Sequence, residues 1–462
     1  MCLVDKLNDL KISTSVEDTS RLIISENKKN KKRSVYNQIS NSKSDSSCFR
    51  DKKANYKLAF GFLQKNIDCY PSNVPSLFTN IELQGVITSH FDHRETSVNK
   101  SSNNAPAYKK CNYECRLTKD NFNGVAHLKD DLTKEYYVRQ IDCHINRTLG
   151  ISVMKKYLGL NLLNGIHSYV PTPPSEFTCL ESLVSFIKLW ETENKVEICK
   201  EETKLTWVCR RHQLAKLALK LITNESFETA IVFYKNKLYL HETDYSLDGI
   251  YSKNDSIKRA CYTGFELERV LTKSEKDATP DIKDLFFLVS KANLLNGTDV
   301  VFQSEIDAMS STADNNSHKK RNNFIEIKSS VPLKSSSFFH GQKLLKMWVQ
   351  TGFVDNSDIL IGFRTSTNNL SGLRLYSRLE IQRLLKKYYN VSKVLNPKIT
   401  CDWLEYITEH INNSILDFIK EKNLNTDYLI SLKLNLTTKR DFTGTLSLDL
   451  LDSVPSWVDM IL

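Results

Sequence analysis

Helical and strand-like segments alternate along the chain from about residue 179 onward, and this alternation constrains the fold more than any other feature. The stretches 179–193 and 211–223 carry leucines at near-helical spacing and predict two helices. The β-rich runs 229–233 and 237–241 are separated only by a short polar turn, which predicts a hairpin. Elements of both kinds are therefore intermingled along one stretch of chain.

Further strands are predicted toward the C-terminus, at 299–303, 324–329, 358–363, 430–436 and 444–450, with the last two expected to pair. The length of 462 residues alone suggests about three domains. No long linker separates two halves after residue 120, however. We therefore predict one large α/β domain of mixed β-sheets flanked by helices.

The N-terminal part has a different composition. Its first fifty residues contain ten serines, no proline and the basic run 28–33, and they hold too few apolar residues to form a core. We predict a disordered tail over 1–55 and a folded domain over 56–462, with polar insertions near 92–110 and 310–323. The basic run is typical of a nuclear address or an RNA-contacting arm, and equally of a solvated charge cluster.

Charge and cysteine content narrow the class of protein. The formal net charge of +10 favours a polyanionic partner such as nucleic acid, although plain solvated surfaces share it. Eleven cysteines without a CxxC pair argue against a secreted disulfide framework. The absence of an apolar run of membrane-spanning length predicts no membrane partner, and the acidic N-terminus resembles no targeting peptide. We expect a soluble, cytoplasmic protein, with a nuclear location as the alternative.

Two pairs of potential zinc ligands are present but lack matching partners. Cys111 and Cys115 lie in a polar stretch, and His90 and His93 lie in another. A structural zinc ion needs four nitrogen or sulfur ligands at defined spacing. We therefore do not expect a zinc site at Cys111 and Cys115, and we interpret His90 and His93 as ordinary loop histidines.

Two short acidic motifs carry the most chemistry. Glu305 and Asp307 share one face of a strand, and Glu326 and Lys328 share one face of another, while the intervening isoleucines point the opposite way. Carboxylates about 4 Å apart repel by roughly 4 kcal/mol at an effective dielectric constant of 20, so such a cluster takes up protons or binds a cation. Oxygen ligands suit magnesium or manganese.

That combination is typical of a metal-dependent nuclease, in which Lys328 orients a water molecule or shares the developing charge. Such spacing alone also occurs in ordinary strands with polar surfaces. The helix predicted over 342–350 adds one candidate, because Lys343, Met347 and Gln350 fall on one face. The amide of Gln350 would contact the metal-bound phosphate or water; a solvated helix face is the alternative.

In order and spacing, these motifs together resemble the DXO family of RNA 5′-end decapping nucleases. The resemblance rests on the segments 264–268, 305–308, 324–330, 343–350 and 361–364, with further matches at 211–216 and 455–457. It implies a fold related to the Asp/Glu-x-Lys metal-dependent nucleases and a magnesium or manganese cofactor. It also implies an enzyme that removes noncanonical, incomplete or NAD caps from RNA and then degrades the 5′-monophosphorylated product from its 5′ end.

The resemblance assigns roles residue by residue. It implies that Glu268, Asp307 and Glu326 bind the metal ion with the main-chain carbonyl of Ile327, and that Glu305 binds it directly or through water. Lys328 and Gln350 would position the water and the scissile phosphate, and Arg211 would bind a substrate phosphate through two N–H groups. The expected catalytic residues are Glu305, Asp307, Glu326, Lys328 and Gln350. The expected substrate-binding residues are Arg211, Glu305, Lys328 and Gln350, and the expected metal-binding residues are Glu268, Glu305, Asp307, Glu326 and Ile327.

Two departures from the family pattern leave questions. Glu266 is an extra acid in Gly-Phe-Glu-Leu-Glu, and if that segment is a strand it shares a face with Glu268. Arg210 precedes Arg211, so the assignment of the arginine is open by one position.

The expected partner is RNA with a capped or monophosphorylated 5′ end. The alternative is a 5′ pyrophosphohydrolase that chiefly binds and stabilises a nuclear 5′-to-3′ exoribonuclease, and a third possibility is an RNA-binding relative without catalysis.

Overall fold

The computed structural model describes most of the chain after the N-terminal tail: residues 52–66, 69–90, 112–117, 128, 155–169, 180–195, 205–223, 226–242, 254–272, 284–311, 322–334, 336–439 and 442–462. The predicted tail before residue 52, the basic run, the insertion at 92–110, Cys111 and His93 lie outside the described residues. Within the described part, no helix is both long enough and apolar enough to span a bilayer.

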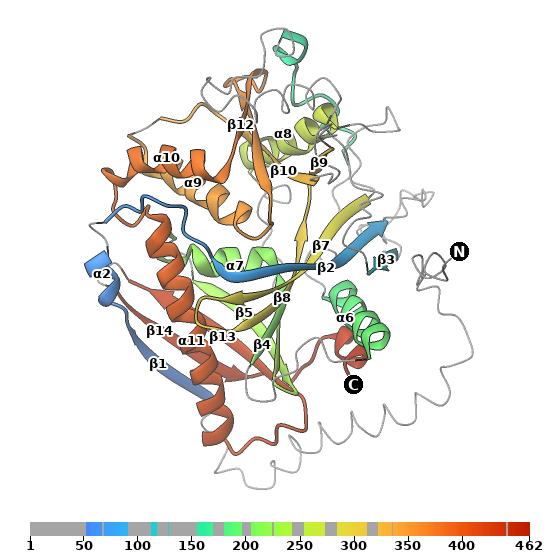
Figure 1. Ribbon diagram of the computed structural model, residues 1–462, viewed down its shortest axis with the longest axis vertical. Helices are drawn as coiled ribbons and strands as arrows, with labels where there is room; N and C mark the ends of the chain where they lie inside the picture. Colours follow the sequence, from blue (N-terminus) through green and yellow to red (C-terminus); the bar gives the residue numbers. More distant parts are fainter. Residues whose placement is uncertain are drawn as a thin grey trace, which may run out of the picture.

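A ten-stranded sheet forms the lower part of the molecule (Figure 1). Its strands, in spatial order, are β1 (Lys53–Ala59), β14 (Thr443–Leu450), β13 (Ile430–Thr438), β5 (Phe227–Tyr234), β6 (Lys237–His241), β4 (Thr206–Arg210), β8 (Asp299–Glu305), β7 (Asp284–Leu294), β2 (Phe78–His90) and β3 (Asn112–Arg116). β4 runs parallel to β6 and β8, and the other pairs are antiparallel, so the sheet is mixed.

The large sheet is buried on both faces, and central strand β4 shows why its sequence is almost continuously apolar. Trp207 and Cys209 point into the largest apolar cluster, with helices α7 (Arg211–Ala218) and α11 (Pro397–Glu421). Val208 points the opposite way, into a second cluster with α6 (Glu181–Asn194) and the short 3-10 helix η5 (Ser456–Met460). Alternation along one strand thus supplies two cores.

A separate four-stranded sheet forms the upper part (Figure 1), in the order β12 (Leu370–Tyr376), β11 (Ser357–Arg364), β10 (Asn322–Ser330) and β9 (Ala308–Ser311). The helices α8 (Asp255–Leu271), α9 (Phe338–Thr351) and α10 (Arg378–Tyr389) accompany it. α9 connects the parallel strands β10 and β11. Short helices α2 (Phe62–Asn66) and η3 (Lys220–Ile222) complete the described elements.

The structure confirms the predicted mixed α/β architecture and most predicted elements. The hairpin is present, but β5 extends to Tyr234, leaving a two-residue turn at Lys235 and Asn236 with φ of 47° and 57°. Two residues with positive φ are typical of the tight turn that matches strand twist. The fold also starts earlier than predicted, because β1 begins at Lys53 and pairs with β14.

The polar insertion predicted at 310–323 is shorter at both ends than expected. Ser310 and Ser311 belong to β9, and Asn322 and Asn323 belong to β10, where Asn322 pairs with Ser311. Polar residues extend a strand when a neighbouring strand satisfies their backbone groups. The remaining residues of that insertion lie outside the described part of the chain.

Candidate metal centre at the junction of the two sheets

The two acidic motifs meet where the chain passes from the large sheet into the small one. Glu305 is the last residue of β8 in the large sheet, and β9 of the small sheet begins at Ala308. Asp307 lies between these strands, and its Oδ2 accepts a hydrogen bond of 2.7 Å from the backbone N–H of Ile327 in β10. The expectation that Glu305 and Asp307 share one face of a strand was therefore wrong, since β8 ends at Glu305 and Asp307 lies outside both strands.

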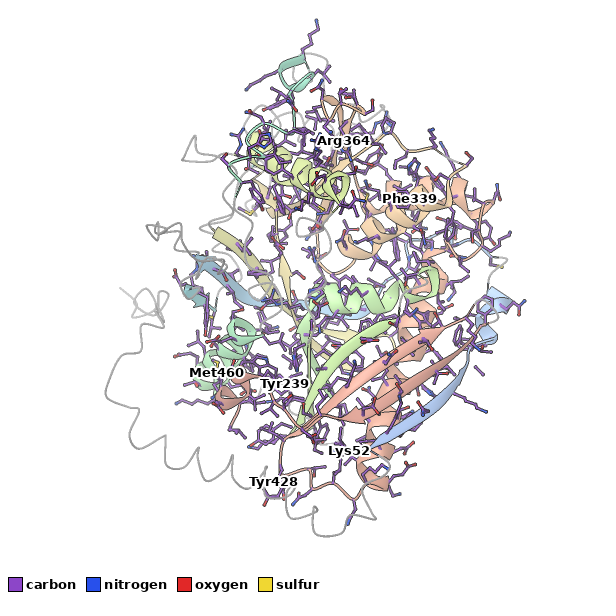
Figure 2. All side chains as sticks on the ribbon, turned by 180° about the vertical axis from the view of Figure 1, so that it is seen from behind. Lys52, Tyr239, Phe339, Arg364, Tyr428 and Met460 are labelled. Atoms are coloured by element: carbon purple, nitrogen blue, oxygen red, sulfur yellow. The ribbon has the colours of Figure 1, made fainter. Side chains whose placement is uncertain are left out.

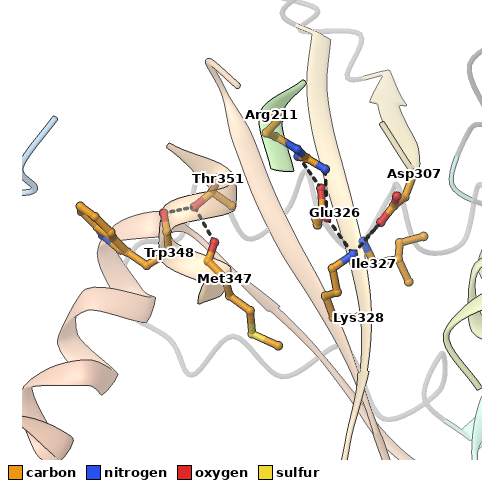
Figure 3. A network of polar contacts seen from close by, with 8 residues as sticks. All are labelled: Arg211, Asp307, Glu326, Ile327, Lys328, Met347, Trp348 and Thr351. Atoms are coloured by element: carbon orange, nitrogen blue, oxygen red, sulfur yellow. Dashed lines mark hydrogen bonds and ion pairs between the residues drawn. The ribbon is translucent and has the colours of Figure 1, made fainter. Parts of the chain in front are cut away.

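Lys328 joins the two motifs through its ammonium group. Its Nζ lies 2.7 Å from Oε1 of Glu326 and 3.4 Å from Oδ2 of Asp307 (Figure 3). The side chain of Glu326 is only 4% exposed. Ile325 and Ile327 point the other way, into an apolar cluster beneath α8, so the predicted alternation of polar and apolar residues along β10 is confirmed.

Arg211, the first residue of α7, binds the same carboxylate from the other side. Its two terminal nitrogens lie 2.9 Å and 3.4 Å from the two oxygens of Glu326 (Figure 3). The neighbouring Arg210 instead places its guanidinium 5.8 Å from the ring centre of Phe287. The structure thus places Arg211 at the carboxylates, although here its guanidinium is engaged by Glu326.

The segment 264–268 is helical, contrary to the strand expected from its alternation. α8 begins after Asn254, whose side chain accepts a hydrogen bond from the backbone N–H of Ser256. Two positions along a helix differ by about 200°, so Glu266 and Glu268 point to different sides. Glu266 is buried and accepts two hydrogen bonds from Arg269, at 2.8 Å and 2.7 Å.

Glu268 turns toward the acidic motifs. Burial raises the pKa of its carboxyl group well above the usual range, and the charges of Asp307, Glu305 and Glu326 raise it further, against the opposing effect of Lys328. Burial followed by the charge of Asp307 raises the pKa of Glu305 to about 7. Acids from α8, from the β8–β9 passage and from β10 therefore influence one another electrostatically.

The pKa of Glu326 is shifted in the opposite direction to those of Glu268 and Glu305. Burial alone would raise its pKa, but the charges of Arg211 and Lys328 outweigh burial and lower the pKa to about 2. For Lys328, burial favours the neutral amine, yet the charges of Asp307, Glu326 and Glu268 raise its pKa, so it stays protonated. When all groups are ionised, four carboxylates face two cations, which leaves an excess of negative charge.

This residue set fits a hard divalent cation in donor type and in charge. Its donors are carboxylate oxygens, and a divalent ion would compensate the excess negative charge. Among the described residues, no three acidic, histidine or cysteine side chains already surround a common point suited to a metal ion. Lys328 and Arg211 instead hold the Glu326 carboxylate, and Lys328 also contacts Asp307.

The helix expected to supply Gln350 is α9, and the structure corrects its predicted face. Met347 is buried in the largest apolar cluster rather than lying with the polar residues. Lys343, predicted on the same face, donates from its Nζ to the carbonyl oxygen of Ser329 at 3.2 Å and to the hydroxyl of Ser330 at 2.9 Å. Gln350 is half-buried in the last turn, and no hydrogen bond joins its side chain to the carboxylates within the described part.

Of the four potential zinc ligands in the sequence, Cys115 and His90 lie in the described part of the chain. Cys115 is buried in β3, with its thiol 3.9 Å from the carbonyl oxygen of Ser182, as an ordinary core residue would be. His90 ends β2. The Arg269 partner of Glu266 was missed, although its position three residues later on a helix is the usual spacing of an ion pair.

Comparison with known proteins identifies the family. Residues 120–448 match the family described as RAI1 like PD-(D/E)XK nuclease. The chain belongs to this family. Over 299 residues, the chain is 29% identical to Decapping and exoribonuclease protein 1 of Kluyveromyces lactis, covering 62% of this chain and 70% of that protein. The predicted resemblance to decapping nucleases is confirmed.

Solved structures share the fold of this chain. The crystal structure of K. lactis Dxo1 in complex with manganese aligns with a TM-score of 0.58 at 20% identity, covering 87% of this chain and 99% of that one. Candida albicans Rai1 in complex with pU5-Mn²⁺ aligns with a TM-score of 0.56 at 17% identity, covering 83% and 94%. The predicted fold class is confirmed.

Proposed function

We propose that this protein is a divalent-metal-dependent nuclease of RNA 5′ ends, which removes noncanonical, incomplete or NAD caps by phosphodiester hydrolysis and degrades the 5′-monophosphate RNA in the 5′-to-3′ direction. The observation that carries the proposal is the convergence of Glu268, Glu305, Asp307 and Glu326 on Lys328 at the junction of the sheets. The names of the K. lactis relative and the pU5-Mn²⁺ complex of C. albicans Rai1 support RNA as substrate.

The carboxylates are the proposed metal ligands. Glu268, Asp307 and Glu326 would hold magnesium or manganese with the main-chain carbonyl of Ile327, and Glu305 would act directly or through water. When bound, such an ion polarises a phosphodiester and activates water. The raised pKa of Glu305 supports this role, because a buried acid that resists ionisation gains most from a nearby cation.

The cationic and amide side chains are the proposed substrate contacts. Lys328 remains protonated, so it serves as a donor to a phosphate oxygen or to water and not as a base. Arg211 uses two terminal nitrogens for Glu326, and a guanidinium has five N–H donors, which leaves donors for a substrate phosphate. Gln350, in the last turn of α9, would position the attacking water or the scissile phosphate.

The test is incubation of the purified protein with 5′-labelled NAD-capped, GpppN-capped and 5′-monophosphate RNAs in the presence of Mg²⁺ or Mn²⁺. We expect release of the cap and shortening from the 5′ end, both abolished by chelation. Intact RNA in every lane would contradict the proposal. Release of pyrophosphate from triphosphorylated RNA without further digestion, together with co-purification of a 5′-to-3′ exoribonuclease, would favour the alternative function.

The matched inactive protein is the double variant Glu305→Gln with Asp307→Asn. It should lose cleavage while folding normally, because both substitutions keep the side-chain shape and remove only charge. The metal-free variant should melt at a higher temperature than the metal-free wild type, since the repulsion between the two acids is relieved. Cleavage at the wild-type rate would show that the centre is elsewhere.

A further inference from the structure

One face of α9 carries an exposed aromatic side chain followed by two lysines. Phe339, Lys343 and Lys346 are spaced by four and three residues, so they lie along the same side of the helix. The Nζ of Lys343 is held by Ser329 and Ser330 at the end of β10, the same strand that carries Glu326 and Lys328. This face therefore begins beside the carboxylate site and extends toward the start of α9.

Positive charge gathers along this face. Burial, followed by the charges of Arg364, Lys346 and Lys328, lowers the pKa of Lys343 to about 8. Four cationic side chains from α9, β10 and β11 are thus close enough to repel one another. A polyanion placed beside them would relieve this repulsion.

Arg364 has a hydrogen-bond donor that the described residues do not satisfy. One terminal nitrogen donates to Oδ1 of Asn368 at 2.7 Å, whereas its Nε is buried without a partner in the described part of the chain. Because β10 and β11 are parallel, with Ser330 beside Phe363, Arg364 lies just beyond the strand end that holds Lys343. A buried donor without an acceptor is costly, and a phosphate oxygen would satisfy it.

Phe339 is not part of the apolar core. It is 66% exposed, while Leu344, Leu345 and Trp348 of the same helix are buried. Figure 2 shows Phe339 at the surface of the upper part of the molecule, the part that also contains Arg364. Surfaces that bind single-stranded nucleic acid combine cations for the backbone with aromatic rings on which bases stack.

We propose that Phe339, Lys343 and Arg364 form a docking surface for single-stranded RNA on the 3′ side of the scissile phosphate. The ring of Phe339 stacks on a base, and the two cations bind backbone phosphates. Several cations spread over an open surface can bind successive phosphates of a continuous RNA strand. A single released nucleotide would need only one binding position. The inference rests on the proposed nuclease function and adds the path of the RNA.

The test measures binding of 5′-phosphorylated oligonucleotides of about two and about twelve nucleotides by fluorescence anisotropy, in the Glu305→Gln/Asp307→Asn background so that the RNA stays intact. Adding Phe339→Ala should weaken binding of the longer RNA about tenfold relative to the shorter one, because base stacking is lost. Phe339→Trp should restore it. Lys343→Gln should reduce the slope of log Kd against log salt by about 0.7, the value for one phosphate contact on a single strand.

A matched control is Phe62→Ala on α2, another exposed phenylalanine, which packs beside Tyr406 and should leave binding unchanged. Equal binding of the longer RNA with and without Phe339 would overturn the docking surface while leaving the nuclease assignment intact. An equal loss for both lengths would also overturn it, since Phe339 would then contact the first nucleotides. Failure of the parent protein to bind either RNA would contradict the proposed function itself.

Discussion

Arg210 and Arg211 differ by one position in the chain but have different surroundings. Arg211 reaches Glu326 through two hydrogen bonds, whereas Arg210 lies over the ring of Phe287. The difference follows from the end of β4, where the last strand residue and the first residue of α7 point in different directions. The sequence alone left the choice between them open.

Replacing Arg211 by lysine should therefore impair the enzyme more than the same change at Arg210. A lysine ammonium cannot form the paired contact with both oxygens of Glu326. We expect Arg211→Lys to lower kcat/KM for monophosphorylated RNA by about tenfold to 100-fold, on the scale of about 1.4 kcal/mol per factor of ten. Steady-state kinetics with Arg210→Lys as the control checks this, and equal losses in both variants would contradict the assignment of Arg211.

α8 shows, at the scale of one element, where local pattern reasoning fails. The five residues 264–268 alternate as a strand does, yet the buried positions Tyr262, Glu266, Leu267 and Leu271 follow helical spacing over a longer window. Asn254 supplies the helix start signal ten residues earlier than Gly264. A longer window would have identified the helix, but not which acid faces the other carboxylates.

The two acids of α8 should consequently behave differently. Glu266→Gln removes the charge paired with Arg269 and should lower the free energy of unfolding by about 1–2 kcal/mol, with cleavage retained. Glu268→Gln should abolish cleavage and leave the melting temperature of the metal-free protein unchanged or higher. Measuring thermal unfolding and RNA cleavage for both variants tests this difference. Loss of cleavage in Glu266→Gln would show that this acid belongs to the metal centre.

Packing of α8 on the small sheet fixes the position of Glu268. A Cβ at Gly362 in β11 would lie 2.5 Å from a methyl carbon of Leu267, the residue before Glu268. Gly362→Ala should therefore displace α8, cost about 1–3 kcal/mol of stability and reduce cleavage. Gly264→Ala on α8 is the control for stability, because nothing lies within 4 Å of the added carbon and alanine favours a helix interior. Equal melting temperatures for the wild type and Gly362→Ala would contradict this packing argument.

At the scale of the whole molecule, the elements were predictable but their grouping into sheets was not. Periodicity predicted β8, β10, β11, β13 and β14, since it depends only on which side chains face a core. Nothing local in Glu305–Ala308 distinguishes a continuing strand from a passage between sheets, because that depends on pairing with residues far away in sequence. The motifs therefore predicted which acids converge and not how the backbone brings them together.

A divalent ion at the centre should stabilise the whole protein. At about 100 times its Kd, a ligand that binds only the folded state adds roughly 2.7 kcal/mol, or about 3 °C in Tm for a chain of this size. We expect Mn²⁺ to raise the Tm of the wild type by this amount and to have little effect on Glu326→Gln, which loses one of the proposed ligands. Equal shifts in both proteins would indicate that the ion binds somewhere else.

The position of the acids between two separately hydrogen-bonded sheets has a mechanical consequence. Glu305 moves with the ten-stranded sheet and Glu326 with the four-stranded one, so any sliding between the sheets changes the distance between these carboxylates. An ion coordinated by both of these carboxylates would cross-link the upper and lower halves of the protein. Substitutions far from the acids, in the apolar contacts between the halves, would then alter ion affinity without touching a ligand.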